Sequence, residues 1–173
     1  MFRPLLILLC ACAALSGAPV IAQDGRDLSE EARRQYAQGL REASALVKDR
    51  QFANASAKLD VLLTQRPREP QARFLKGVVQ TEQGQDTAAI ATFRALSEDY
   101  PELPEPYNNL AVLYAQKGEY EGARIALESA VKASPDWAVA HENLGDIYVR
   151  LGAAEYATAA KLGFRGGTVA GNI

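Results

Sequence analysis

The sequence predicts an all-α protein, a solenoid in which antiparallel helix pairs stack one after another. The first observation is a spacing of 34 residues, a period typical of stacked helical units. The second is that apolar residues between the repeated positions follow helical spacing. The third is the composition of the 173 residues, 48% hydrophobic and 23% charged, which is that of an ordinary globular protein. The repeated positions are Pro67, Pro101 and Pro135; Gly84, Gly118 and Gly152; Ala55, Ala89, Ala123 and Ala157; and Gly77, Ala111 and Gly145.

Residues 1–22 have the three-part pattern of a secretory signal peptide. Arg3 gives a short basic start, an apolar run follows to Leu15, and Ala22 is a small residue at the end of a segment suited to cleavage. The apolar run is shorter than a membrane span requires. We therefore expect export and cleavage after Ala22, a retained membrane anchor being the alternative.

Both cysteines of the chain, Cys10 and Cys12, lie in this segment. Cleavage would leave a mature chain with no disulfide, thiol nucleophile or cysteine-ligated metal. The segment also loosely matches the pattern that directs lipid attachment, which would make Cys12 a lipid-modified N-terminus. The location expected from the signal is the periplasm, with a membrane-attached lipoprotein as the alternative.

Residues 23–35 are expected to hold a short linker and the start of the first helix. The linker covers Asp24 to Leu28, and Ser29 can then cap a helix whose acidic second and third residues suit its positive end. Helical spacing of apolar residues continues from there to about Lys48.

Residues 104–137 show the repeat most clearly. One apolar stripe at helical spacing runs from Tyr107 to Tyr114, and a second runs from Tyr120 to Ala130. Gly118 separates the stripes, because glycine readily takes the left-handed conformation that ends a helix. We therefore expect one helical hairpin in each repeat.

This pattern resembles the tetratricopeptide repeat (TPR) family, whose 34-residue unit is a helical hairpin. The resemblance covers nearly all of the chain after the signal and implies a right-handed superhelix. It divides the chain into a divergent unit at 36–69, units at 70–103 and 104–137, and an incomplete unit at 138–165, before a flexible tail at 166–173. The best-matching unit supplies Tyr107, Leu110, Ala111, Tyr114, Gly118, Ala123, Leu127, Ala130 and Pro135.

Two departures from the repeat affect the ends of the solenoid. Arg50 replaces the inter-helix glycine of the first unit, and the last unit lacks its terminal proline. No polar capping helix follows the last unit, although solenoids usually cover their final apolar face. Either the second helix of the fourth unit serves as the cap, or that face meets a partner.

No constellation of catalytic or metal-ligating residues stands out, so neither an enzyme nor a cofactor is predicted. His141, the single histidine, is interpreted as a packing residue between helices, and Asp146 and Arg150 are interpreted as a surface ion pair. The formal net charge of −2 gives no electrostatic reason to expect a nucleic acid partner. No membrane span is expected in the mature form, and the oligomeric state is left open.

The resemblance implies that the first helices of the units line a concave groove that binds a protein or peptide. Residues suited to the chaperone-binding carboxylate clamp of some TPR proteins are absent, since Phe74 and Val78 occupy two of its positions. Structural and binding roles are evenly matched for Asn109 and Asn143. The candidate groove residues are Gln71, Phe74, Val78, Thr81, Glu82, Glu105, Asn108, Asn109, Val112, Ala115, Gln116, Val139, Glu142, Asn143, Asp146, Val149 and Arg150.

The sequence thus predicts an exported, non-catalytic adaptor that holds a peptide or a partner helix in the TPR groove. The alternative is a permanent accessory subunit of an envelope assembly, division or secretion complex, docked through its C-terminal end.

Overall fold

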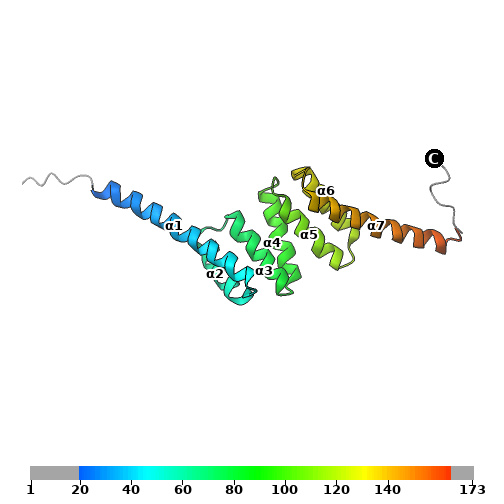
Figure 1. The fold of residues 1–173 in the computed structure, drawn as a ribbon, viewed down its shortest axis with the longest axis horizontal. Coiled ribbons are helices and arrows are strands. Elements are labelled where there is room, and N and C mark those ends of the chain that lie inside the picture. Colours follow the sequence, from blue (N-terminus) through cyan, green and yellow to red (C-terminus); the bar gives the residue numbers. More distant parts are fainter. Residues whose placement is uncertain (1–19, 165–173) are drawn as a thin grey trace, which may run out of the picture. The chain divides into compact units, whose positions relative to one another are not determined.

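A computed structural model describes the backbone of residues 20–164 and the side chains of residues 30–164. The chain divides into two compact units, one ending at Ala37 and the other beginning at Gln38. The described residues form helices joined by short turns and no strands (Figure 1). The helices are α1 (Val20–Lys48), α2 (Phe52–Gln65), α3 (Pro70–Glu82), α4 (Asp86–Asp99), α5 (Pro104–Gln116), α6 (Tyr120–Ala133) and α7 (Ala138–Lys161).

Helix α1 begins at Val20, so the prediction of a linker from Asp24 to Leu28 and a helix start at Ser29 is wrong. No proline occurs between Val20 and Lys48, and a single turn-forming residue such as Gly25 costs a helix only about 1 kcal/mol. The predicted signal peptide lies mostly outside the described residues, as do Cys10 and Cys12.

Three inter-helix turns repeat the same geometry at a spacing of 34 residues. Arg50, Gly84 and Gly118 have φ angles of 58°, 70° and 77°, in the left-handed region. The residue after each donates its backbone N–H to a carbonyl five residues earlier, as Glu119 does to Tyr114 at 2.9 Å. This closure satisfies carbonyls that the helix end would otherwise leave without a partner. The predicted helical hairpins therefore form as α1–α2, α3–α4 and α5–α6.

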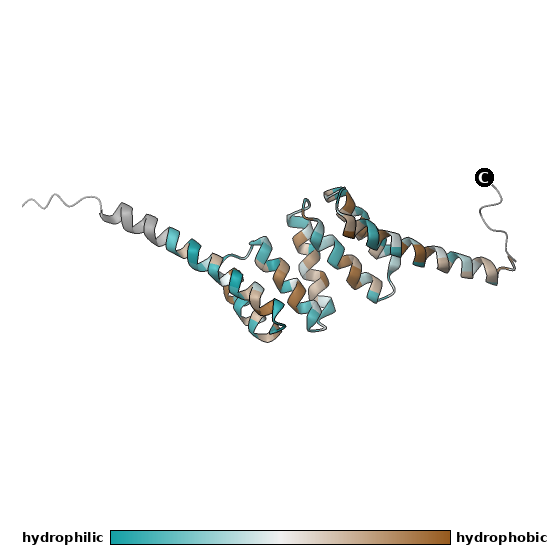
Figure 2. Ribbon diagram, viewed as in Figure 1, coloured by the Kyte–Doolittle hydropathy of each residue, from teal (hydrophilic) through white to brown (hydrophobic). Residues whose placement is uncertain are grey.

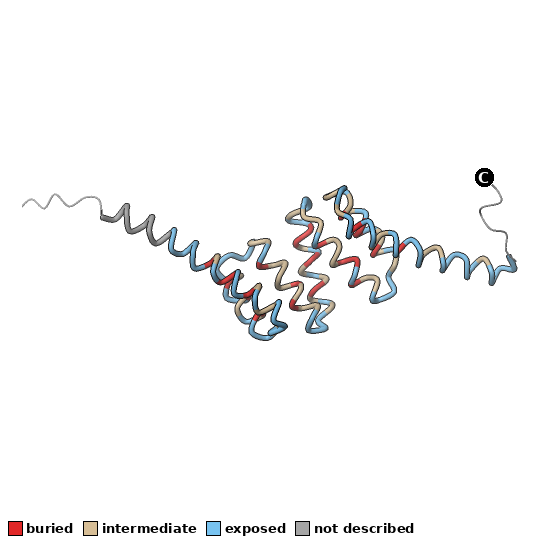
Figure 3. Tube along the Cα trace, in the orientation of Figure 1, coloured by how far each residue is buried: buried red, intermediate tan, exposed pale blue. Residues whose placement is uncertain are grey.

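The core lies where the helices of the unit from Gln38 onward pack side by side, each contacting the next along the chain. Three alanines that lie one repeat apart are completely buried: Ala55, Ala89 and Ala123. Figure 3 shows buried residues in red along the helices that pack together. Alanine lets two helix backbones approach closely, which explains why this position recurs. Brown and teal residues alternate along α2 to α6 in Figure 2, as amphipathic helices require.

Helix α7 continues without a turn through Gly152, so the predicted hairpin of a fourth unit is wrong (Figure 1). Gly152 lacks the positive φ of Gly84 and Gly118, and the left-handed turn occurs instead at Gly163, with φ of 90°. The physical reason is the alanine-rich sequence that follows Gly152, because alanine is the strongest helix former. The described residues thus form three helix pairs followed by one long helix, which takes the place of the incomplete fourth unit.

The predicted tail at 166–173 lies outside the described residues. Within the described part of the chain, no helix has both the length and the apolar character needed to cross a membrane.

Candidate partner-binding groove

A pocket of about 280 Å³ lies between α5 and α7, and we call it the α5–α7 pocket. Its buried floor comes from Ala111, Leu127 and Ile147. The remaining lining residues are six that the sequence had placed in the groove: Val112, Ala115, Gln116, Asn143, Asp146 and Arg150. The pocket therefore combines an apolar floor with a rim that carries two amide side chains and two opposite charges.

A hydrogen bond between side chains joins the two helices that form this pocket. Asn143 Nδ2 donates to Asn108 Oδ1 at 2.7 Å, and the pair is partly buried. Asn109 instead donates to the carbonyl of Glu105 in its own helix at 2.8 Å. The two asparagines that sequence reasoning treated alike therefore differ, since Asn143 connects α7 to α5 and lines the pocket, whereas Asn109 does neither.

The two charged residues at the rim do not pair with each other, and the predicted Asp146–Arg150 ion pair is wrong. The Arg150 guanidinium carbon lies 5.7 Å from the centre of the Tyr120 ring, in a cation–π contact. No hydrogen bond or ion pair joins Asp146 to another of the described side chains. Attraction to the ring, together with exposure of both side chains to water, outweighs a surface ion pair worth a few tenths of a kcal/mol.

The predicted groove residues of α3 serve packing and local bonding. The Phe74 ring lies 5.8 Å from the buried Phe93 ring, tilted by 57°, and Val78 packs against the same core cluster. Thr81 donates to the Gly77 carbonyl at 3.0 Å, and Glu82 pairs with Arg50 at 3.5 Å. Only Gln71 among the α3 candidates is exposed and has no such interaction.

Of the other candidates, Glu105, Val139 and Glu142 are exposed but do not line the pocket. Val149 is 72% exposed, and it too is absent from the pocket lining.

His141 is exposed, so its interpretation as a packing residue is wrong. Its Nε2 lies 2.7 Å from the Pro135 carbonyl oxygen. At the α6–α7 turn the His141 ring nitrogen finds this backbone partner. A position buried between helices would leave the same nitrogen without one.

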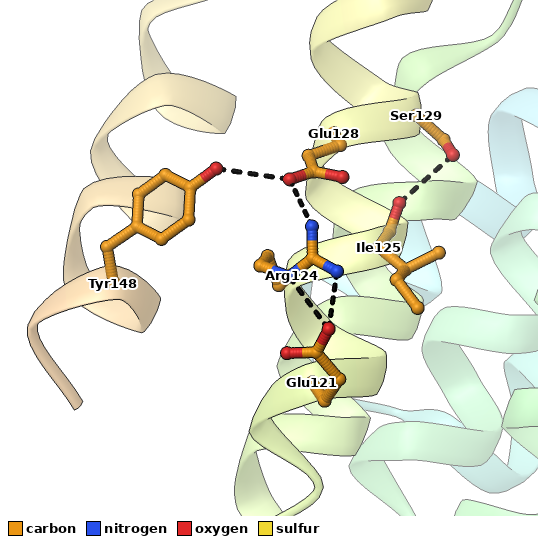
Figure 4. A network of polar contacts seen from close by, with 6 residues as sticks. All are labelled: Glu121, Arg124, Ile125, Glu128, Ser129 and Tyr148. Atoms are coloured by element: carbon orange, nitrogen blue, oxygen red, sulfur yellow. Dashed lines mark hydrogen bonds and ion pairs between the residues drawn. The ribbon is translucent and has the colours of Figure 1, made fainter. Parts of the chain in front are cut away.

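A polar network that sequence reasoning missed connects α6 to α7 (Figure 4). Arg124 pairs with both Glu121 and Glu128 on its own helix, and Tyr148 of α7 donates to Glu128 at 3.1 Å. The Arg124 hydrogen bond holds the pKa of Glu121 below its ordinary value, and the bond to Glu128 raises the pKa of Tyr148. The i, i+3 and i, i+4 spacing of the acids around Arg124 was visible in the sequence, but the contact with Tyr148 depends on how α7 packs.

Among the residues that the structure describes, no three histidine, cysteine, aspartate or glutamate side chains cluster closely enough to hold a metal ion.

Two sequence models of the family match the chain, and together they cover more than half of it. The first is described as a tetratricopeptide repeat and matches residues 40–104; the second is described as a TPR repeat and matches residues 113–152. No curated protein sequence matches the chain.

Solved structures with a similar fold include the Sgt2 TPR domain of Aspergillus fumigatus, at 15% identity and a TM-score of 0.66, covering 70% of this chain and 82% of that one. The type III secretion chaperone SycD of Yersinia enterocolitica, in complex with a peptide of the translocator YopD, has 16% identity and a TM-score of 0.63, covering 68% and 95%. MamA of Desulfovibrio magneticus has 26% identity and a TM-score of 0.61, covering 79% and 77%. The repeated turns, the stacked helix pairs and these matches agree, and the chain belongs to the tetratricopeptide repeat family.

Proposed function

We propose that this chain is a non-catalytic adaptor, exported to the cell envelope, which binds an extended peptide or a partner helix along α5 and α7. The observation that carries the proposal is the α5–α7 pocket, whose apolar floor and polar rim suit one anchoring side chain with hydrogen-bonding backbone on either side. TPR proteins are in general interaction scaffolds, and the similar SycD is in complex with a peptide.

The size of the pocket favours a side chain over a metabolite. Small-molecule sites usually enclose about 300–1,000 Å³ and bury most of their ligand. The α5–α7 pocket has about 280 Å³, which is at the lower limit of that range. A leucine-sized or methionine-sized anchor is therefore the ligand group that we expect.

The rim adds two features that select the partner. Asn143 and Gln116 offer amide groups for hydrogen bonds to a peptide backbone, although one Asn143 donor already bonds to Asn108. Asp146 and Arg150 lie at the rim with opposite charges and no ion pair between them. We expect a bound peptide to carry a basic group near Asp146 and an acidic group near Arg150.

The test selects binding peptides from a displayed peptide library and measures their affinity for the purified chain by calorimetry. Val112→Asp, which places a charge at the pocket, is expected to weaken selected peptides at least tenfold, a loss of about 1.4 kcal/mol. Ile125→Asp is the matched control, because Ile125 is another exposed aliphatic residue in the middle of a helix but does not line the pocket. Equal losses from both variants would contradict the proposal.

Export to the periplasm rests on the three-part pattern of residues 1–22, and Cys12 within this segment is the basis of the lipoprotein alternative. Mass spectrometry of the chain isolated separately from the envelope and the cytoplasm of a Gram-negative cell distinguishes the alternatives. An N-terminus at Gln23 supports cleavage and a periplasmic protein, a lipid on Cys12 supports a lipoprotein, and an intact Met1 in the cytoplasm contradicts export.

A second candidate function is that of an accessory subunit in an envelope complex, docked through the C-terminal end. The observation that favours it is the exposure of Tyr156, Leu162 and Phe164, at 65%, 84% and 60%. Replacing these three side chains by polar ones is expected to abolish incorporation into the complex. The α5–α7 pocket would still bind its peptide.

A further inference from the structure

Asp146 and Arg150 lie four residues apart on α7, and both line the α5–α7 pocket without pairing with each other. Residues at this spacing are neighbours on a helix surface, and an acid that precedes its base is the more favourable order for an ion pair. Glu30 and Arg34 of α1 have the same spacing and order, and they do form an ion pair, at 3.5 Å. The separation of Asp146 from Arg150 therefore has a local cause.

Tyr120 supplies that cause. It is the first residue of α6, and its ring is partly buried against the core, so the fold fixes its position. The Arg150 guanidinium carbon lies 5.7 Å from the centre of this ring. At an exposed site, the attraction of a cation to an aromatic ring is at least comparable to a surface ion pair. The ring therefore competes with Asp146 for Arg150.

The other polar neighbour of Asp146 along α7 is also held by a different helix. Asn143 lies three residues before it and donates Nδ2 to Asn108 Oδ1 of α5 at 2.7 Å. Asn143 is thus directed to α5, and Arg150 is directed to α6. No ion pair joins Asp146 to any other side chain in the described part of the molecule. Its carboxylate remains available to a bound partner.

Arg150 keeps its hydrogen-bonding capacity in this arrangement. A cation–π contact depends on the charge of the guanidinium and uses none of its five N–H donors. Within residues 30–164, no carboxylate forms an ion pair with these donors. They can therefore bind a partner's carboxylate through two parallel hydrogen bonds.

We propose that Tyr120 sets the charge preference of the α5–α7 pocket by holding Arg150 away from Asp146. The pocket then presents two separate opposite charges, instead of an ion pair that neutralises itself. A partner with complementary charges is favoured, and a partner with like charges in the same places is rejected. Tyr120 acts through Arg150 and is a positioning residue, and its role rests on the peptide-binding function proposed above.

The distance between the two charges determines the spacing that a partner needs. Four residues of α-helix rise about 6 Å. In an extended peptide, side chains two residues apart lie on the same side, roughly 6.6 Å from each other along the chain. We therefore expect a bound extended peptide to carry a basic and an acidic residue separated by one residue. The basic residue would lie at Asp146 and the acidic residue at Arg150.

Nuclear magnetic resonance of the free full chain tests the contact without any peptide. The ring current of Tyr120 is expected to displace the signals of the Arg150 side-chain protons from those of an exposed arginine. Tyr120→Leu removes the ring and is expected to abolish the displacement, whereas Tyr120→Phe keeps a ring and is expected to retain it. Absence of the displacement in the unchanged chain would overturn the proposal, whether or not peptides bind.

Calorimetry with the library-selected peptides tests the consequence for selectivity. Replacing the acidic residue of a peptide by its amide is expected to weaken binding to the unchanged chain roughly threefold to fivefold. In Tyr120→Leu the same peptide change is expected to have an effect of less than about twofold, because Arg150 is then free to pair with Asp146. Adding Asp146→Asn to Tyr120→Leu removes that competitor, so the preference for the acidic residue is expected to return.

Tyr114→Leu is the matched control for loss of a tyrosine ring. Tyr114 is also partly buried against the core and accepts a hydrogen bond from an arginine, Arg94, at 2.8 Å. Neither residue lines the α5–α7 pocket. This variant is expected to leave the charge preference of the peptides unchanged, and loss of the preference here as well would contradict a specific role of Tyr120.

The outcomes separate this role from the peptide-binding function itself. Peptides that Val112→Asp weakens, but whose charge preference survives Tyr120→Leu, would overturn the role of Tyr120 and leave the binding function standing. Failure to select any peptide, or equal losses from Val112→Asp and Ile125→Asp, would overturn both.

Discussion

Gly77 and Phe93 illustrate how one small residue fixes the distance between two helices. Phe93 is completely buried, and its ring occupies the space that a side chain on residue 77 would need. The 34-residue series of small residues indicated that position 77 must be small. It could not indicate which ring fills the space, because that depends on how α3 and α4 cross.

Gly77→Ala is expected to destabilise the fold by about 1–3 kcal/mol, since the added methyl group would overlap a ring that has no room to move. Chemical denaturation measures the change. Gly122→Ala is the control, because a Cβ there makes only ordinary contact with Tyr114 at 3.5 Å. This change is expected to stabilise α6 by up to about 1 kcal/mol, as replacement of glycine by alanine within a helix does. Equal effects of both changes would contradict the packing argument.

Arg50 shows a limit of sequence reasoning at the same scale. Arg50 replaces the turn glycine of the other units, and it adopts the same left-handed conformation, with φ of 58°. Its guanidinium pairs with Glu82 at 3.5 Å and lies 5.4 Å from the centre of the Phe52 ring. These two contacts with residues outside the turn help to offset the backbone cost, and the sequence alone did not reveal them.

At the scale of elements, α7 is the part of the fold that the sequence predicted least well. Gly152 fits the repeat spacing, and that periodicity predicted a turn. Local helix preference decided otherwise, because alanines follow Gly152, whereas Gly84 precedes Gln85 and Gly118 precedes Glu119. The same glycine series therefore marks a turn at Gly118 and a helix interior at Gly152.

The same substitution at these two positions should have opposite effects. Gly118→Ala is expected to destabilise the fold by about 1–2 kcal/mol, because alanine is strained in the left-handed region. Gly152→Ala is expected to stabilise α7 by up to about 1 kcal/mol. Thermal denaturation in dilute solution, followed by circular dichroism, measures both. Destabilisation by Gly152→Ala would indicate a turn at that position and contradict a continuous α7.

The hydrogen bond from Tyr148 of α7 to Glu128 of α6 predicts that the stability of the fold depends on pH in the alkaline range. Because the hydrogen bond to Glu128 raises the pKa of Tyr148 in the folded state, its contribution to stability is complete below the unfolded pKa near 10. The contribution is then lost as the pH rises through the higher pKa of the folded state. We expect the difference in melting temperature between the unchanged chain and Tyr148→Phe to be constant from pH 7 to 9 and to shrink above pH 10. A difference that does not change with pH would contradict this bond.

At the scale of the whole molecule, the sequence predicted the fold class well because one period governs both turns and core. Ala55, Ala89 and Ala123 are buried, and the family is confirmed. The groove was predicted less completely. Six of its candidate residues line the α5–α7 pocket, while Phe74 and Val78 pack against the core. Repeat position identifies the inner helices, but it does not identify which of their side chains are needed for packing.

Stacked repeats gain stability mainly from their neighbours, so the second half of α7 should contribute little to the rest of the fold. A chain that ends at Gly152, which keeps Leu151 packed against the core, is expected to lose less than about 1 kcal/mol, a shift of about 2–4 °C in melting temperature. Ile147→Ala is the comparison, because Ile147 is buried and its truncation is expected to cost about 2–5 kcal/mol. A large loss of stability in the shortened chain would indicate tertiary contacts that the exposure of this segment does not suggest.

The continuous α7 has a further consequence for how its C-terminal end moves. The segment from Leu151 to Lys161 extends a helix that the packed residues before it have already nucleated, so each of its residues needs only the propagation step. Most of its side chains are exposed, so few tertiary contacts hold it in place. The helix should therefore fray from Lys161 backward, and its backbone amide hydrogens should exchange with solvent faster toward that end.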